Sequence, residues 1–239
     1  MYNEFANIYD KVMRDTPYDD WIAYYHNIFK KENVKPELIL DMGCGTGNIT
    51  ARLAACGYDM IGLDASPEML SIAKEKNPEI LYLLMDMREF ELYGTVDVIV
   101  SALDTVNYIT EEIDKVFRLV ANYLNPGGLF IFDINSAHKL RHTLGDAPIF
   151  CDEEDITYFW ESEIEENLCH FDITFFIKNE DETYSRCDEW QTERIYEIQE
   201  LSANLEKAGL TLRGIYDAFT FSPPKEDSER IFFVVSKEK

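Results

Sequence analysis

Positive charge is scarce in this sequence of 239 residues. Its 22 lysines and arginines stand against 46 aspartates and glutamates, so the formal net charge is −24. No basic stripe along the chain offsets this excess. Such a surface repels phosphate backbones and anionic membranes. The composition therefore disfavours nucleic-acid and membrane partners, and it leaves small molecules or a basic protein as candidate ligands.

Long apolar runs are also missing. No stretch approaches the ~18 apolar residues of a membrane span, and the first 15 residues contain acids with no apolar run typical of a signal peptide. The five cysteines form no C-x-x-C pair, which favours reduced thiols and no metal site. We therefore expect a cytoplasmic protein.

Short apolar runs and helical segments alternate through the first part of the chain. Strand-like runs are found at 38–40, 59–64, 81–85, 96–103 and 129–134, with helical apolar spacing between them. Before them, Thr16 and Pro17 predict the N-cap and first residue of a helix over 17–31. This alternation is typical of a doubly wound α/β sheet.

From about Pro148 the sequence becomes aromatic, β-branched and acidic in rough alternation. Residues 151–200 hold 17 acidic and three basic residues, more than half of the net negative charge. We interpret this segment as three antiparallel strands inserted after the fifth core strand. We expect one domain over 1–239, with a core of about 1–145 and 195–239 and an inserted β lid of about 146–194.

Glycines 43, 45 and 47 follow the first predicted strand. They allow a tight turn that presents backbone N–H groups near a helix N-terminus, which suits an anion or a closely packed ligand. A dinucleotide fingerprint would need a glycine at position 48, which is asparagine. A Walker-type Gly-Lys-Ser/Thr is also missing.

Three aspartates stand at the carboxyl ends of the first three strands: Asp41, Asp64 and Asp86. In an open parallel sheet these ends line one crevice. Asp41 suits an ammonium group, Asp64 two vicinal ribose hydroxyls, and Asp86 an exocyclic amine. An amino acid joined to an adenosine would use all three.

Four segments together resemble the class I S-adenosylmethionine-dependent methyltransferases, as a bacterial member of the small-molecule type. They are residues 41–47, 62–70, 85–88 and the turn at 125–128. The resemblance implies a Rossmann-like fold with a seven-stranded, mostly parallel sheet and a final antiparallel strand within 211–236. It also implies S-adenosylmethionine as cofactor, in contact with Tyr9, Asp41, Gly43, Cys44, Gly45, Gly47, Asp64, Ala65, Asp86, Met87 and Leu103.

The acceptor side is less defined by the sequence. In this family the end of the fourth strand faces the transferred methyl group, so Asp104, Asn107 and Tyr108 are candidates to orient the acceptor. Asp104 and Tyr108 are also candidates to relay its proton. From the lid, His170 is a candidate proton relay and Arg194 a candidate carboxylate ligand. The alternative is that the lid aromatics form its own core and that Arg194 pairs with neighbouring acids. The chain lacks the Asn/Asp-Pro-Pro-Tyr/Phe signature of nucleobase and glutamine methylation.

The sequence therefore predicts methyl transfer to a small-molecule acceptor. Two alternatives stay open: a cofactor-binding module that acts through protein contacts of its acidic lid, and an RNA methyltransferase. The acceptor, the methylated atom and the oligomeric state are not predicted.

Overall fold

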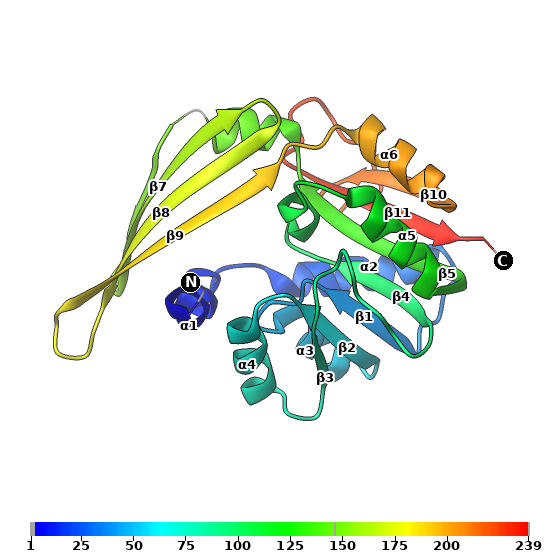
Figure 1. The fold of residues 1–239 in the computed structure, drawn as a ribbon, viewed down its shortest axis with the longest axis horizontal. Helices are drawn as coiled ribbons and strands as arrows, with labels where there is room; N and C mark the ends of the chain where they lie inside the picture. The colour runs from blue at the N-terminus through cyan, green and yellow to red at the C-terminus, as the bar shows by residue number, and fades with distance from the viewer. Residues whose placement is uncertain (1–2, 146, 239) are drawn as a thin grey trace.

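A seven-stranded sheet forms the centre of the molecule (Figure 1). The computed structural model describes residues 3–145 and 147–238. The strand order is β10-β11-β5-β4-β1-β2-β3, and β11 runs antiparallel to both of its neighbours. The strands are β1 (Leu38–Met42), β2 (Asp59–Asp64), β3 (Leu81–Leu84), β4 (Val96–Ser101), β5 (Leu124–Asn135), β10 (Leu210–Asp217) and β11 (Arg230–Lys237). This confirms the predicted Rossmann-like, mostly parallel sheet.

Helices cover both faces of this sheet. They are α1 (Asn3–Val12), α2 (Tyr18–Lys31), α3 (Asn48–Ala55), α4 (Pro67–Lys76), α5 (Ile113–Tyr123) and α6 (Ile198–Lys207), with a short 3-10 helix η1 (Thr105–Tyr108) and a π turn η2 (Lys139–Thr143). Neighbouring strand residues point to opposite faces: Ile39 packs with the apolar cluster of α2 and α3, and Leu40 with that of α5 and α6. Strands buried on both faces explain the nearly unbroken apolar runs. Within the described residues, no helix is long and apolar enough to cross a membrane.

The start of α2 differs from the prediction. Pro17 occupies the N-cap position, and no side chain caps the helix. The Thr16 hydroxyl instead contacts the sulfur of Met13 at 3.9 Å. The predicted Thr16 cap is therefore wrong, although the helix itself lies where the sequence placed it.

A second, antiparallel sheet holds four strands, one more than predicted: β6 (Ile149–Asp152), β7 (Ile156–Glu165), β8 (Leu168–Lys178) and β9 (Tyr184–Arg194). The added strand β6 is only four residues long and pairs with β7, with Phe150 opposite Phe159. We call β6–β9 the lid sheet. It extends away from the larger sheet, with α1 beneath its concave side (Figure 1). Residues 1, 2, 146 and 239, which fall in the expected domain and lid ranges, lie outside the described part.

Helix α1 connects the lid sheet to the glycine loop. The Phe5 ring packs against Phe175 of β8, with their centroids 5.5 Å apart. Lys11 forms an ion pair at 2.9 Å with Asp155, at the edge of the lid sheet. On its other side, Asp10 accepts a hydrogen bond of 2.6 Å from Thr46 in the glycine loop. The helix therefore fixes the lid sheet over the carboxyl ends of the core strands.

Candidate active site

A cavity of about 820 Å³ lies at the carboxyl ends of β1–β4, beneath α1 and the lid sheet. Pockets that hold small ligands have volumes of roughly 300–1,000 Å³, so the volume of this cavity lies in the upper part of that range. Open parallel sheets bind ligands at this edge. Residues from the glycine loop, the strand ends, α1 and the inner face of the lid sheet all line it.

The glycine loop uses its backbone N–H groups internally. Gly43 and Cys44 donate to the Leu63 carbonyl at 2.7 and 2.9 Å, and Gly45 donates to the Asp64 carboxylate at 2.8 Å. These three donors are therefore used within the protein, and the Gly45 donor is directed at the carboxylate of Asp64. The close approach of a ligand to the loop is still favoured, because Gly43 and Gly45 line the cavity without side chains.

Asp64 is held in place by the backbone on both sides. One carboxylate oxygen accepts from Gly45, and the other accepts from the Ser66 N–H at 2.8 Å. Burial raises the pKa of Asp64 above its usual range. A carboxylate offers about four lone-pair positions, so two remain for a ligand that enters the cavity.

Asp41 lies deeper, at the end of β1, and is almost fully buried. Its carboxyl accepts a hydrogen bond of 2.5 Å from the Thr50 hydroxyl. Burial raises the pKa of Asp41 to about 7, and the nearby Asp64 adds to this rise. A cationic ligand group beside Asp41 would therefore favour its ionised form.

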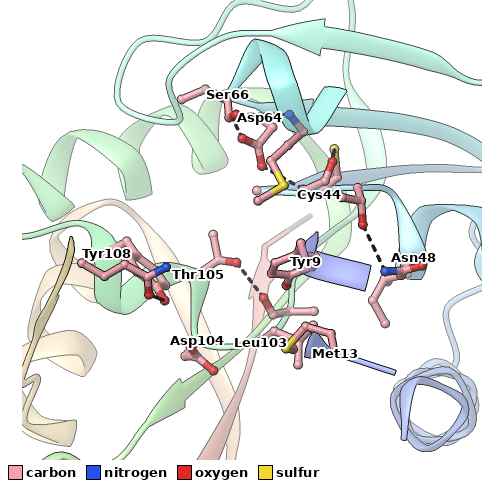
Figure 2. Close-up of a pocket in the computed structure, with 18 of the residues that line it drawn as sticks. Tyr9, Met13, Cys44, Asn48, Asp64, Ser66, Leu103, Asp104, Thr105 and Tyr108 are labelled. Atoms are coloured by element: carbon pink, nitrogen blue, oxygen red, sulfur yellow. Dashed lines mark hydrogen bonds between the residues drawn. The ribbon is translucent and has the colours of Figure 1, made fainter. Parts of the chain in front are cut away.

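Twelve of the sequence-predicted residues meet in this cavity. They are Tyr9, Asp41, Gly43, Cys44, Gly45, Asp64, Ala65, Asp86, Met87, Leu103, Asp104 and Tyr108. Figure 2 shows Tyr9 from α1 at the centre of this group, between the glycine loop and Leu103–Thr105. Asp86 is already paired: Arg88 donates to it through Nε at 2.9 Å and through its backbone N–H at 2.8 Å. Gly47 is outside the lining and instead caps α3 at φ +78°.

Three expected acceptor-side residues do not line the cavity. The buried Asn107 amide donates to the backbone carbonyls of Asn135 and Arg194, so it fastens η1 to its neighbours. Arg194 donates to Glu200 at 2.8 Å and to the Thr110 carbonyl, which matches the alternative in which it pairs with neighbouring acids. The His170 ring lies beside Thr192 at 3.0 Å. None of these three side chains is positioned to contact a ligand in this cavity.

The structure adds four charged residues to the cavity lining that the sequence analysis did not name as site residues: Arg88, Lys139, Glu193 and Arg230. Arg230 donates to Asp104 at 2.8 Å and also pairs with Asp133 of β5, whose side chain is 0% exposed. The one local sign of this ion-pair cluster is Asp133 itself, a charged residue in the otherwise apolar run 129–134 of β5. Lys139 lies in η2 and Glu193 in β9, and local sequence does not predict where these two elements meet the core.

Backbone strain is concentrated where β4 enters the cavity. Leu103 and Asp104 both have positive φ, 58° and 55°, a conformation that non-glycine residues seldom adopt. Both of their backbone N–H groups donate to the Asp133 carboxylate, at 3.0 and 3.1 Å. Trp21 also donates to this carboxylate, through its indole N–H at 3.1 Å. Asp133 thus stabilises the turn that presents Asp104 to the cavity.

The chain is similar to known methyltransferases over its whole length. Residues 39–128 match a family model described as a methyltransferase domain. The YqeM protein of Bacillus subtilis (strain 168), named as a methyltransferase, is 35% identical over 100% of this chain and 98% of its own. The chain belongs to the class I S-adenosylmethionine-dependent methyltransferases.

Solved structures agree with this membership. An S-adenosylmethionine-dependent methyltransferase from Clostridium acetobutylicum ATCC 824 has a TM-score of 0.92 and 33% identity, covering 100% of this chain and 99% of its own. CalS10 from Micromonospora echinaspora, an amino pentose methyltransferase with bound S-adenosylmethionine, shares the fold at 18% identity, with a TM-score of 0.78 and 96% of each chain covered. This methyltransferase therefore uses S-adenosylmethionine as its methyl donor.

Proposed function

We propose that this methyltransferase methylates a small polar molecule that binds beneath the lid sheet, next to the cofactor. The observation that carries the proposal is the single continuous cavity. Asp64 and Asp86 line it from the core, and Trp160 and Glu193 line it from the inner face of the lid sheet. A volume of about 820 Å³ suits a cofactor and a second small ligand together.

The cofactor half of the cavity fits S-adenosylmethionine chemically. In this proposal Asp41 meets the ammonium group, the two remaining lone-pair positions of Asp64 meet the ribose hydroxyls, and Ala65 and Met87 pack on the adenine. Gly43 and Gly45 allow close approach of the methionyl part. The cofactor supplies an electrophilic methyl group when bound, and Tyr9 on α1 closes the cavity on that side.

The acceptor half combines apolar and polar side chains. Ile173 and Phe175 provide an apolar wall that excludes water, and Gln191 and Tyr108 provide polar groups 2.9 Å apart. The buried indole N–H of Trp160 has no hydrogen-bond partner within the described residues. Positioning an acceptor this way supplies on the order of 7–11 kcal/mol in favourable cases.

The acidic lid supports a small acceptor over RNA. The outer face of the lid sheet carries Glu161, Glu163 and Asp172, and these side chains would face any polynucleotide laid across it. The amino pentose methyltransferase with the same fold also acts on a small molecule. We further propose that the lid and core work as one domain, because the cavity is formed by both.

Cofactor binding is tested first by calorimetric titration with S-adenosylmethionine. We expect Asp64→Ala to weaken binding at least about tenfold, which is 1.4 kcal/mol, because two ribose contacts are lost. Asp59→Ala is the matched control, since Asp59 lies at the exposed opposite end of the same strand. Equal binding by both variants would overturn the proposed role of Asp64.

Acceptor class is tested with cofactor labelled in its methyl group. The purified enzyme is incubated separately with the small-molecule, RNA and protein fractions of a bacterial extract. We expect label in the small-molecule fraction. Transfer only to RNA would support the RNA alternative, and a protein retained by the lid without any transfer would support the binding-module alternative.

A further inference from the structure

Glu193 is a buried carboxyl group in the acceptor half of the cavity. It lies on the inner face of β9, is 2% exposed, and lines the cavity. Within the described residues its one hydrogen-bond donor is the Asn135 amide, at 2.9 Å. A buried carboxyl group with one neutral partner is costly unless something else compensates it.

The cations around Glu193 are directed elsewhere. Arg230 of β11 donates to Asp104 and Asp133, and Lys139 of η2 donates to the side-chain amide oxygen (Oδ1) of Asn135 at 2.8 Å. No ion pair to Glu193 forms among the described residues. The Asn135 amide therefore separates the carboxyl group from the nearest ammonium group.

The remaining titratable groups around Glu193 supply no positive charge. Cys169 of β8 is its direct partner in the sheet register, and Tyr108 of η1 lies in the same cavity lining. Asp104, at the end of β4, carries a negative charge that disfavours a second one on Glu193. The positive charges of Lys139 and Arg230 act on Glu193 from a distance, but neither residue forms an ion pair with it among the described residues. The site thus holds a carboxyl group without a direct ion pair, and this group lines the space where an acceptor would bind.

We propose that Glu193 is the proton acceptor of the reaction and that the acceptor molecule is an amine, which enters the cavity as an ammonium ion. This inference rests on the proposed small-molecule function. The ammonium group supplies the direct ion pair that neither Lys139 nor Arg230 makes with Glu193. A neutral hydroxyl acceptor would supply no such ion pair.

The proposed step balances in protons and electrons. The bound ammonium group transfers one proton to the Glu193 carboxylate and becomes a neutral amine. Its nitrogen lone pair then forms the bond to the methyl carbon, while the carbon–sulfur bond breaks and its electron pair stays on sulfur. The products are a methylated ammonium ion and S-adenosylhomocysteine, and the Glu193 proton passes to solvent when they leave.

The product class is the first test. After incubation of the enzyme with labelled cofactor and the small-molecule fraction of a bacterial extract, the labelled product is applied to a cation-exchange resin at pH 10 and at pH 3. We expect retention at pH 3 with label on nitrogen by mass spectrometry. Label on oxygen, carbon or sulfur would overturn the proposal.

The role of Glu193 is tested with Glu193→Gln, which keeps the shape and an acceptor for Asn135 but cannot take the proton. General-base catalysis contributes about 10²–10⁴-fold, so we expect at least a 100-fold loss of kcat with unchanged affinity for S-adenosylmethionine. Glu189→Gln is the matched control. Glu189 is also buried on the same strand and face, but it does not line the cavity.

The pH profile separates proton transfer from a structural role. Burial and Asp104 raise the pKa of Glu193 to about 8, so the wild-type rate should rise with pH through that value. Glu193→Gln should lose this rise, and Glu189→Gln should keep it. A full wild-type rate in Glu193→Gln would overturn the proposal. If cofactor binds but no small molecule is labelled, the proposed function fails, and this inference fails with it.

Discussion

Arg230 and Asp104, 126 positions apart in the chain, form an ion pair of 2.8 Å in the lining of the cavity. The same guanidinium pairs with Asp133, which in turn accepts the backbone N–H groups of Leu103 and Asp104. One arginine on the last strand therefore pairs with both carboxylates that shape the turn after β4. The antiparallel placement of β11 beside β5 is what brings it there.

Removing this arginine should destabilise the protein strongly. Arg230→Met leaves Asp133 buried and without its cation, a change that costs about 3–5 kcal/mol in unfolding free energy. Urea unfolding measures it. Arg118→Met is the control, because Arg118 and Asp114 form an exposed i,i+4 pair worth about 0.3–0.5 kcal/mol. Similar losses in the two variants would mean that Asp133 does not depend on Arg230.

Gly43 should be intolerant of a side chain for a reason beyond its backbone angle. A Cβ at Gly43 would lie 2.1 Å from Cγ2 of Thr105, whereas a Cβ at Gly57 would meet nothing within 4 Å. Both glycines have positive φ, so alanine at either position costs roughly 1–2 kcal/mol of backbone strain. Gly43→Ala should add about 1–3 kcal/mol of overpacking and weaken cofactor binding.

Gly57→Ala is the matched control for this comparison. It should show the strain in urea unfolding but bind S-adenosylmethionine as the wild type does, because Gly57 lies outside the cavity lining. If Gly43→Ala retained wild-type affinity, the contact between the glycine loop and Thr105 would not control the shape of the cofactor half.

The core of the fold could be predicted from local sequence because its signals are local. The apolar run of β5, the turn glycines after β1, and the aspartates at the ends of β1, β2 and β3 each depend on a few neighbouring residues. Their meeting in one cavity follows from parallel topology. The family resemblance added the expectation of a final antiparallel strand within 211–236.

The part of the acceptor half that comes from the lid sheet could not be predicted, because it depends on pairing between distant segments. Glu193 faces the cavity, while its neighbours Arg194 and Thr192 lie on the opposite face of β9, and a one-residue shift of register would exchange them. Local sequence favoured Arg194 and His170 as ligands because of their chemistry. The register of the lid sheet instead pairs His170 with Thr192 and leaves Glu193 inside.

The attachment of α1 should depend on the charge of Asp10. Its carboxylate accepts from Thr46 at 2.6 Å, from Asn48 at 2.8 Å and from Lys76 at 2.7 Å. The hydrogen bonds from Lys76, Thr46 and Asn48 lower the pKa of Asp10 against the opposing effect of burial. Since Asp10 is partly exposed, Asp10→Asn should cost only about 0.5–1 kcal/mol at pH 7.

This cost should depend on pH with a defined sign. A lowered native pKa means that the stabilisation is complete above the unfolded value of about 3.9 and is lost as pH falls below it. The difference between wild type and Asp10→Asn should therefore be constant from pH 7 to pH 5 and shrink below pH 4. Hydrogen exchange of the α1 amides gives a local measurement, and faster exchange confined to α1 is expected in the variant.

Binding of S-adenosylmethionine should release a proton from Asp41 at pH 6. Burial raises the pKa of Asp41 to about 7, so the carboxyl group is mostly protonated in the free enzyme at this pH. The ammonium group of the cofactor is charged there, since α-amino groups titrate near 7.7–8.0, and its approach favours the carboxylate. Release should approach one proton at pH 6 and decline as pH rises through 7.

Calorimetry in two buffers of different ionisation enthalpy measures the protons released. Asp41→Asn should abolish the release and weaken binding. It should also raise stability more at pH 8 than at pH 4, because the raised native pKa of Asp41 removes stability progressively between the unfolded value of about 3.9 and about 7, and this loss is complete above that range. If the wild type binds the cofactor at pH 6 without releasing a proton, Asp41 does not meet its ammonium group, and the cofactor is oriented differently from our proposal.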